Sequence, residues 1–259
     1  MKTQAEWPIA FFDDEYLRIY LPQFTPERTE LEVDFIEKAL APAPGEAVLD
    51  LACGSGRHAI HMARRGYRVT GVDFNPRYLE IAAEEARRAG VNVEWVARDM
   101  RELDFSGAFD RVYSYFTSFG YYSDEENELV LERVARALRL GGRLLLDVLN
   151  RDWLFTVPQK RTWNQREDGA LLMEEVSIDL RTSRVTSRLT LIEPDKGARP
   201  AKKFDLRAYT CAELTALLRR AGLAVREVWG GADRSEYTAE SRRLILLAEK
   251  TGSRGADAG

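Results

Sequence analysis

The first half of the chain alternates short apolar runs with stretches in which apolar residues recur at helical spacing. Residues 48–51, 67–73 and 91–97 form the apolar runs, which have the length and composition of buried parallel strands. Two stretches of helical period lie between them, 57–65 and 76–89, and each ends at a glycine. Strands and helices in regular alternation predict βαβ units, and therefore a doubly wound α/β sheet.

After residue 150 the pattern changes from the period of a helix to that of a strand. Val185, Leu189 and Leu191 alternate with polar neighbours, so we expect an antiparallel insertion of about three strands. Helix and strand patterns return near the C-terminus. The predicted organisation is an N-terminal lid segment (1–24), an α/β core (25–150), the antiparallel insertion (151–207), a C-terminal part of the core (208–250) and a disordered tail (251–259).

Composition and charge narrow the class of protein. The chain has 259 residues, 42 acidic and 38 basic, for a net charge of −4. It has no basic stripe, so nucleic acid is not an expected partner. No apolar run approaches the roughly 18 residues that span a membrane, and no secretion signal is recognisable, so we expect a cytoplasmic protein. Cys53 and Cys211 predict no disulfide framework, and His58 and His61 lack the further ligands of a metal site.

The most informative feature is a tight glycine turn after the first predicted strand. Gly54 and Gly56 let the backbone pass close to a ligand, and the amides of the following helix point at the same place. Asp73 ends the second predicted strand, 17 residues past Gly56, where doubly wound folds place a carboxylate against a ribose diol. Asp99 follows the third strand in the same way. Parallel strands end at one edge of the sheet, so these features predict a single nucleotide site.

The residues of this turn and its neighbours resemble the motifs of a known family. Val-Leu-Asp-Leu-Ala-Cys-Gly-Ser-Gly at 48–56, Gly-Val-Asp-Phe at 71–74 and Arg-Asp-Met at 98–100 are similar to those of class I S-adenosylmethionine-dependent methyltransferases. Leu-Gly-Gly at 140–142 resembles the turn before their fifth strand. The resemblance implies a seven-stranded, mostly parallel Rossmann-like sheet, S-adenosylmethionine as cofactor and S-adenosylhomocysteine as product. The cofactor-binding residues expected on this basis are Arg28, Asp50, Ala52, Cys53, Gly54, Gly56, Asp73, Phe74, Asp99, Met100 and Tyr115.

A narrower resemblance concerns glycine N-methyltransferase, to which residues 28–67 are similar. In that family an arginine 22 residues before the motif aspartate binds the cofactor's carboxylate, and Arg28 lies 22 residues before Asp50. A second family arginine, two residues after the match to Asp147, binds the substrate's carboxylate. Leu149 occupies that position here and cannot pair with a buried carboxylate. Glycine is therefore not an expected substrate, and the chain also resembles small-molecule N- and O-methyltransferases, including those for amino sugars and natural products.

Aromatic residues mark the expected acceptor pocket. The loop at 113–122 holds four tyrosines and two phenylalanines, and aromatic faces favour a sulfonium and partly apolar acceptors. Methyl transfer is a direct displacement that depends mainly on alignment. Tyr115 and Tyr121 are the candidate catalytic residues if a proton must leave an amine or hydroxyl acceptor. The expected pocket residues are Tyr16, Tyr20, Phe116, Tyr121, Tyr122 and Leu149. The insertion is expected to form either a third wall of the pocket or a homodimer surface.

Two other functions fit parts of the sequence. A nicotinamide-dependent oxidoreductase could use the same turn, since Gly-Ser-Gly-Arg-His-Ala at 54–59 nearly satisfies the dinucleotide pattern. No catalytic Tyr-x-x-x-Lys or histidine pair follows, and Asp99 would have no role. A non-catalytic S-adenosylmethionine-binding module is the third alternative, and the intact aromatic loop argues against it.

Overall fold

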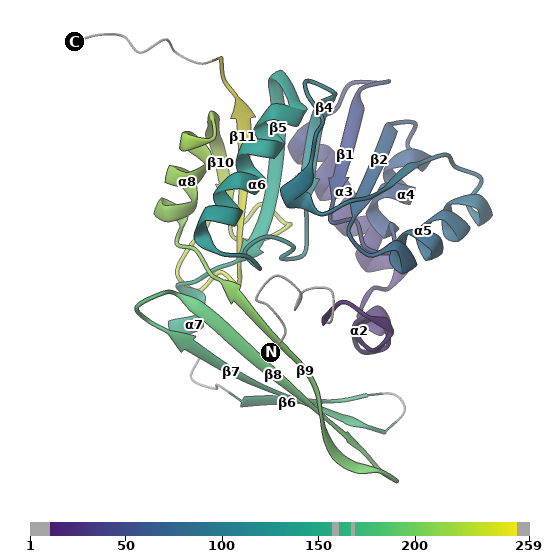
Figure 1. Cartoon of the computed structure of the whole chain (residues 1–259), viewed down its shortest axis with the longest axis vertical. Coiled ribbons are helices and arrows are strands. Elements are labelled where there is room, and N and C mark those ends of the chain that lie inside the picture. The colour runs from purple at the N-terminus through teal and green to yellow at the C-terminus, as the bar shows by residue number, and fades with distance from the viewer. Residues whose placement is uncertain (1–10, 157–160, 167–168, 253–259) are drawn as a thin grey trace.

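A seven-stranded sheet runs through the core in the order β10-β11-β5-β4-β1-β2-β3 (Figure 1). The structure, a computed structural model, describes residues 11–156, 161–166 and 169–252. β1 pairs in parallel with β2 and β4, whereas β11 is antiparallel to both β5 and β10. The strands are β1 (Ala47–Leu51), β2 (Arg68–Asp73), β3 (Glu94–Ala97), β4 (Phe109–Ser114), β5 (Leu138–Leu149), β10 (Leu223–Trp229) and β11 (Arg243–Lys250). The predicted mostly parallel sheet is confirmed.

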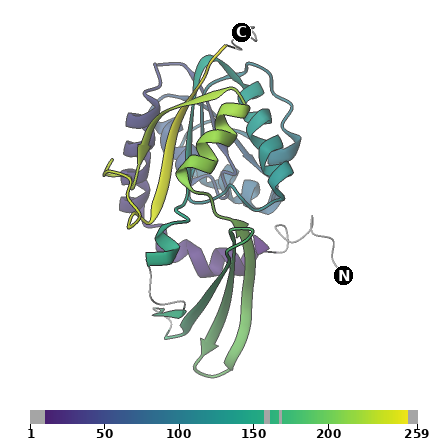
Figure 2. The same ribbon diagram turned by 90° about the vertical axis from the view of Figure 1, so that its left-hand side faces the viewer.

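Helices cover both faces of this sheet (Figures 1 and 2). One face packs against α3 (Pro26–Leu40), α4 (Arg57–Arg64) and α5 (Pro76–Arg88), and the other against α6 (Asp124–Ala137) and α8 (Cys211–Arg220). Polar side chains accept a backbone N–H at the start of four of these helices, which satisfies donors that the helix itself leaves free. These caps are Thr25, Asn75, Ser123 and Thr210.

The insertion forms a separate antiparallel sheet in the order β6-β7-β8-β9. Its strands are β6 (Arg161–Gln165), β7 (Leu171–Asp179), β8 (Arg184–Glu193) and β9 (Gly197–Arg207), preceded by the short helix α7 (Trp153–Thr156). About three strands were expected and four are present. The pattern missed β6 because all five of its residues are exposed, so no buried face alternates along it.

A short helix lies between the two sheets. α2 (Asp14–Tyr20) and the 3₁₀ turn η1 (Leu21–Gln23) sit below the core and above β6–β9 in Figure 2. A second 3₁₀ turn, η2 (Met100–Glu102), follows β3. Parts of two predicted segments, 1–10 of the lid and 253–259 of the tail, lie outside the described residues. In the described part of the chain no helix has the length and apolar character needed to cross a membrane.

Candidate active site

The turn between β1 and α4 adopts backbone conformations that favour glycine. Ala52, Gly54 and Gly56 have φ angles of +60°, +56° and +77°, in the left-handed region where a Cβ is strained. A Cβ on Gly56 would lie 2.5 Å from the ring of Trp95, whereas one on Gly54 would meet nothing within 4 Å. Gly56 is therefore required by packing inside the core, and Gly54 leaves open space beside the turn.

Asp73 closes the turn from the neighbouring strand. Its two carboxylate oxygens accept the backbone N–H groups of Gly54 and Asn75, each at 2.9 Å. Burial raises the pKa of Asp73 to about 6, although hydrogen bonds from the backbone work in the opposite direction. A largely buried carboxylate at this strand end is suited to accept further hydroxyl donors from a ligand.

A cavity opens beside this turn, at the carboxyl ends of β1, β2 and β4, where ligands bind in open parallel sheets. The sequence-predicted residues that line it are Tyr16, Ala52, Cys53, Gly54, Asp73, Phe74, Met100, Tyr115, Phe116, Tyr121 and Tyr122. Most of the wall is aromatic. Phe12, for example, packs edge to face on Tyr16 and Tyr121, with ring centroids 4.8 and 5.4 Å apart.

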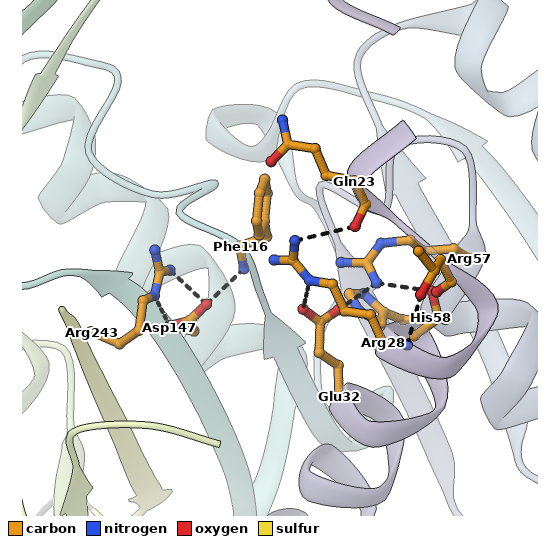
Figure 3. Close-up of polar contacts among 10 residues, drawn as sticks. Gln23, Arg28, Glu32, Arg57, His58, Phe116, Asp147 and Arg243 are labelled. Atoms are coloured by element: carbon orange, nitrogen blue, oxygen red, sulfur yellow. Dashed lines mark hydrogen bonds and ion pairs between the residues drawn. The ribbon is translucent and has the colours of Figure 1, made fainter. Parts of the chain in front are cut away.

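A buried carboxylate at one end of the cavity collects three basic side chains (Figure 3). Glu32 of α3 accepts hydrogen bonds from Arg28 at 2.9 Å and from His58 at 2.9 Å, and it pairs with Arg57. Burial would raise the pKa of Glu32, but the hydrogen bond from His58 and the charge of Arg57 lower it to about 2. Burial lowers the pKa of His58 to about 4, so this histidine is neutral at pH 7. Two arginines against one carboxylate leave the cluster with one excess positive charge.

Two phenylalanines carry this cluster to the cavity wall. The guanidinium of Arg57 lies 4.5 Å from the ring centroid of Phe24, and that of Arg28 lies 5.2 Å from Phe116. Arg57, His58, Phe24 and Phe116 line the cavity, whereas Arg28 lies behind the two phenylalanine rings.

The N-terminal helix α2 covers the cavity and is bonded on two sides. On the core side, Asn75 and Tyr78 donate hydrogen bonds to the carbonyls of Phe12 and Asp13, at 2.6 and 3.1 Å. On the side of the antiparallel sheet, Arg199 pairs with Glu15 at 2.7 Å, and Lys202 pairs with Asp13. Arg166 donates to the carbonyls of Arg18 and Ile19. The aromatic N-terminal segment thus lies over the predicted cleft.

Comparison with known proteins gives this arrangement a family. A family model described as a methyltransferase domain matches residues 48–142. The cypemycin N-terminal methyltransferase of a Streptomyces species is 30% identical over 214 residues, which cover 81% of this chain and 85% of that protein. The chain belongs to the S-adenosylmethionine-dependent methyltransferase family. It is an enzyme of that class, and S-adenosylmethionine is its cofactor.

Two solved structures share this fold. The CcbJ methyltransferase from Streptomyces caelestis superposes with a TM-score of 0.76 at 22% identity, covering 88% of this chain and 91% of that one. CalS10 from Micromonospora echinaspora, an amino pentose methyltransferase solved with S-adenosylmethionine bound, gives a TM-score of 0.67 at 22% identity over 91% of this chain and 96% of that one. The oxidoreductase and the non-catalytic module are thereby set aside.

Six residues predicted for this methyltransferase's site lie outside the cavity lining. Tyr20 stacks on Tyr16 with ring centroids 4.5 Å apart. Asp50 is buried, and burial raises its pKa to about 7. Asp99 is held by Arg101 at 2.8 Å. The remaining three are Arg28, Gly56 and Leu149, of which Leu149 lies opposite Arg243 in the β5–β11 pairing.

Sequence reasoning missed several residues that line the methyltransferase's cavity. Arg57 and His58 face it from the first turn of α4, and Thr117 and Ser118 do so from the loop after β4. Arg57 directly follows Gly56, and its place after the glycine turn was the available signal. The partnership of Glu32 with α4 had none, since the two elements meet only in the folded chain.

Proposed function

We propose that this methyltransferase transfers a methyl group to an amine of a small, partly apolar molecule. The observation that carries this is an aromatic cavity without a group suited to deprotonate a hydroxyl. Burial raises the pKa values of Tyr115 and Tyr121 further above the neutral range, so neither phenol is available as a phenolate at pH 7. His58 is tied to Glu32 and has a lowered pKa. An amine needs no such base because it can lose its proton to water before it reacts.

The assignment of cofactor residues rests on the fit of the turn and its neighbours. Open space beside Gly54 admits a ligand, the Asp73 carboxylate suits a ribose diol, and the excess positive charge near Arg28 and Arg57 suits the methionine carboxylate. We assign Phe74 and Met100 to the adenine end, beside Asp99. When bound, S-adenosylmethionine supplies an activated methyl group on a sulfonium. The chain's own residues then orient it and exclude water.

Two observations bear on the acceptor. The relative that covers most of this chain is named for methylation of a peptide N-terminus, which is an amine. A second, polar hollow adjoins the cavity and shares Tyr121 and Tyr122 with it, and its other walls include Glu126, Arg184 and Lys203. A reactive amine in the aromatic cavity and a polar body in this hollow would use both. We therefore propose an acceptor larger than a free amino acid.

Matched acceptor pairs test the proposal. The purified chain is incubated with S-adenosylmethionine carrying a deuterated methyl group and with 2-phenylethylamine or 2-phenylethanol, or with an Ala-Phe peptide or its N-acetylated form. We expect mass spectrometry to find the label on the free amines only. Transfer to the alcohol at a comparable rate would overturn the choice of an amine.

Two conservative variants test the role of the tyrosines. Tyr115→Phe and Tyr121→Phe keep the rings and remove the hydroxyls. We expect transfer to an amine to fall by less than about tenfold, since a general base is worth roughly 100-fold or more. A loss of that larger size in either variant would assign its hydroxyl to proton removal.

Pairing of two chains through the antiparallel sheet stays a prediction, as does a cytoplasmic location. The outer face of this sheet carries Trp163, 67% exposed, directly opposite the exposed Met173. Light scattering on the parent and on Trp163→Glu would show whether this face pairs two copies.

A further inference from the structure

Two consecutive residues in the cavity wall have backbones that their side chains disfavour. Phe116 and Thr117 have φ angles of +67° and +58°, and both line the cavity. Non-glycine residues rarely adopt this left-handed conformation, and two in succession persist only where the surrounding structure imposes them. The question is which contacts impose it.

Asp147 of β5 holds both backbone N–H groups. Its carboxylate accepts the N–H of Phe116 at 2.8 Å, and its main-chain carbonyl accepts the N–H of Thr117 at 3.2 Å. The residue is 1% exposed. A buried carboxylate that is not paired would cost more than these bonds return.

Arg243 of the neighbouring strand β11 supplies the pairing (Figure 3). Its Nε and Nη2 donate to the two oxygens of Asp147 at 2.8 and 2.6 Å, a bidentate geometry. Burial disfavours the charged guanidinium, but the charge and hydrogen bonds of Asp147 keep the pKa of Arg243 above its usual value. Arg243 is not among the residues that line the cavity, so it reaches the site through Asp147.

We infer that Arg243 and Asp147 are positioning residues that fix loop 115–118 in the conformation presented to the methyl acceptor. The bidentate pair fixes the direction of the Asp147 carboxylate, and the carboxylate then fixes the Phe116 backbone. Tyr115 and Tyr121, the other ionisable groups facing Arg243, are neutral at pH 7 and leave the pair intact. The inference rests on the proposed function only in placing the acceptor at this wall.

Hydrogen exchange resolved to single amides tests the loop without any acceptor. Arg243→Lys keeps the positive charge but cannot span both oxygens of Asp147, and Arg243→Met removes the charge. We expect the amides of Phe116 and Thr117 to exchange at least about tenfold faster in both variants. Arg226→Met, which removes an exposed ion pair from β10, is the matched control and should leave both amides unchanged. Unchanged protection in the Arg243 variants would overturn the inference.

Kinetics with 2-phenylethylamine then separate positioning from direct contact. We expect kcat to fall roughly 10-fold to 100-fold in Arg243→Lys, as for a misplaced site, while affinity for S-adenosylmethionine changes by less than about twofold. Adding Thr117→Gly, which adopts the left-handed backbone without strain, should restore part of kcat. A rise in KM alone without rescue would mean that Arg243 contacts the acceptor. A parallel loss of cofactor affinity and melting temperature would mean a general structural role. If the parent methylates no amine, the proposed function fails, and the exchange result still decides this inference.

Discussion

The carboxylate of Asp73 accepts the backbone N–H of Gly54 at 2.9 Å, which ties the end of β2 to the turn that follows β1. The residue is only 7% exposed, yet it lines the cavity. One carboxylate therefore holds the turn in shape and also faces the ligand. Substitutions at this position should affect both properties.

Asp73→Ala should weaken S-adenosylmethionine binding by about 10-fold to 100-fold, since a charge-assisted hydrogen bond is worth roughly 1.5–3 kcal/mol. Isothermal titration on the variant and the parent measures the effect. Asp73→Asn is the control, because an amide oxygen can still accept the N–H of Gly54 and should give a smaller loss. Unchanged affinity in Asp73→Ala would remove Asp73 from the cofactor site.

The raised pKa of Asp73, about 6, predicts a pH dependence of cofactor binding. Above pH 7 the carboxylate is ionised and affinity should be constant. As the pH falls below about 6 the carboxylate is protonated and loses an acceptor, so affinity should fall by up to about tenfold per pH unit. Titrations between pH 5 and pH 8 measure the profile, and Asp73→Asn should flatten it. A profile that stays the same in Asp73→Asn would place the titration on another group, such as Asp50.

Gly56 and Gly54 should respond differently to an added methyl group. Gly56→Ala places a Cβ 2.5 Å from the ring of Trp95 and 2.8 Å from Ala82, so we expect a loss of several degrees in melting temperature in addition to the cost of a positive φ. Gly54→Ala meets no neighbour and should cost only about 1 kcal/mol in folding, with the larger effect on cofactor affinity. Equal losses of stability in the two variants would contradict this packing.

Arg28→Met tests the assignment of the methionine carboxylate. The variant should lose affinity for S-adenosylmethionine and S-adenosylhomocysteine but retain it for methylthioadenosine, which lacks that carboxylate. Arg57→Met is the companion variant, since Glu32 holds both arginines. A uniform loss for all three ligands would indicate that Arg28 only supports Glu32 and the fold of α3.

Deletion of residues 1–22 should abolish methyl transfer while reducing cofactor binding only modestly. The deletion removes the aromatic cover, including Phe12 and Tyr16, but leaves Arg28, Asp73 and the glycine turn. Transfer to 2-phenylethylamine and titration of the cofactor measure the two effects separately. The double variant Phe12→Ala/Tyr16→Ala, which keeps the chain length, should show the same split. Turnover at the parent rate would show that this segment is packing only.

Local patterns sufficed for the parallel core because each βα unit is encoded within a few residues. The strand ending at Leu51, the turn at Gly54 and the carboxylate at Asp73 follow one another along the chain and meet at one sheet edge. The capping serines and threonines were equally legible, since the Ser123–Glu126 and Thr210–Glu213 boxes span only three residues.

Contacts between distant segments could not be predicted in this way. Asp147 and Arg243 are 96 residues apart, and only the register of β5 against β11 brings them together. Gly54 was expected to be the sterically critical glycine, but the ring that restricts the turn, Trp95, lies on β3 and faces Gly56. The left-handed backbone of Phe116 and Thr117 also left no trace, since neither residue type favours it.

The double attachment of α2 has a consequence for the speed of the reaction cycle. S-adenosylhomocysteine must leave and a new cofactor must enter beneath this helix, and the bonds to Asn75 on one side and Arg199 on the other hold it in place. Exchange of product for cofactor therefore requires breaking several bonds in concert with a shift of the antiparallel sheet. We expect release of product, rather than methyl transfer itself, to limit turnover, with a burst of methylated product in the first cycle.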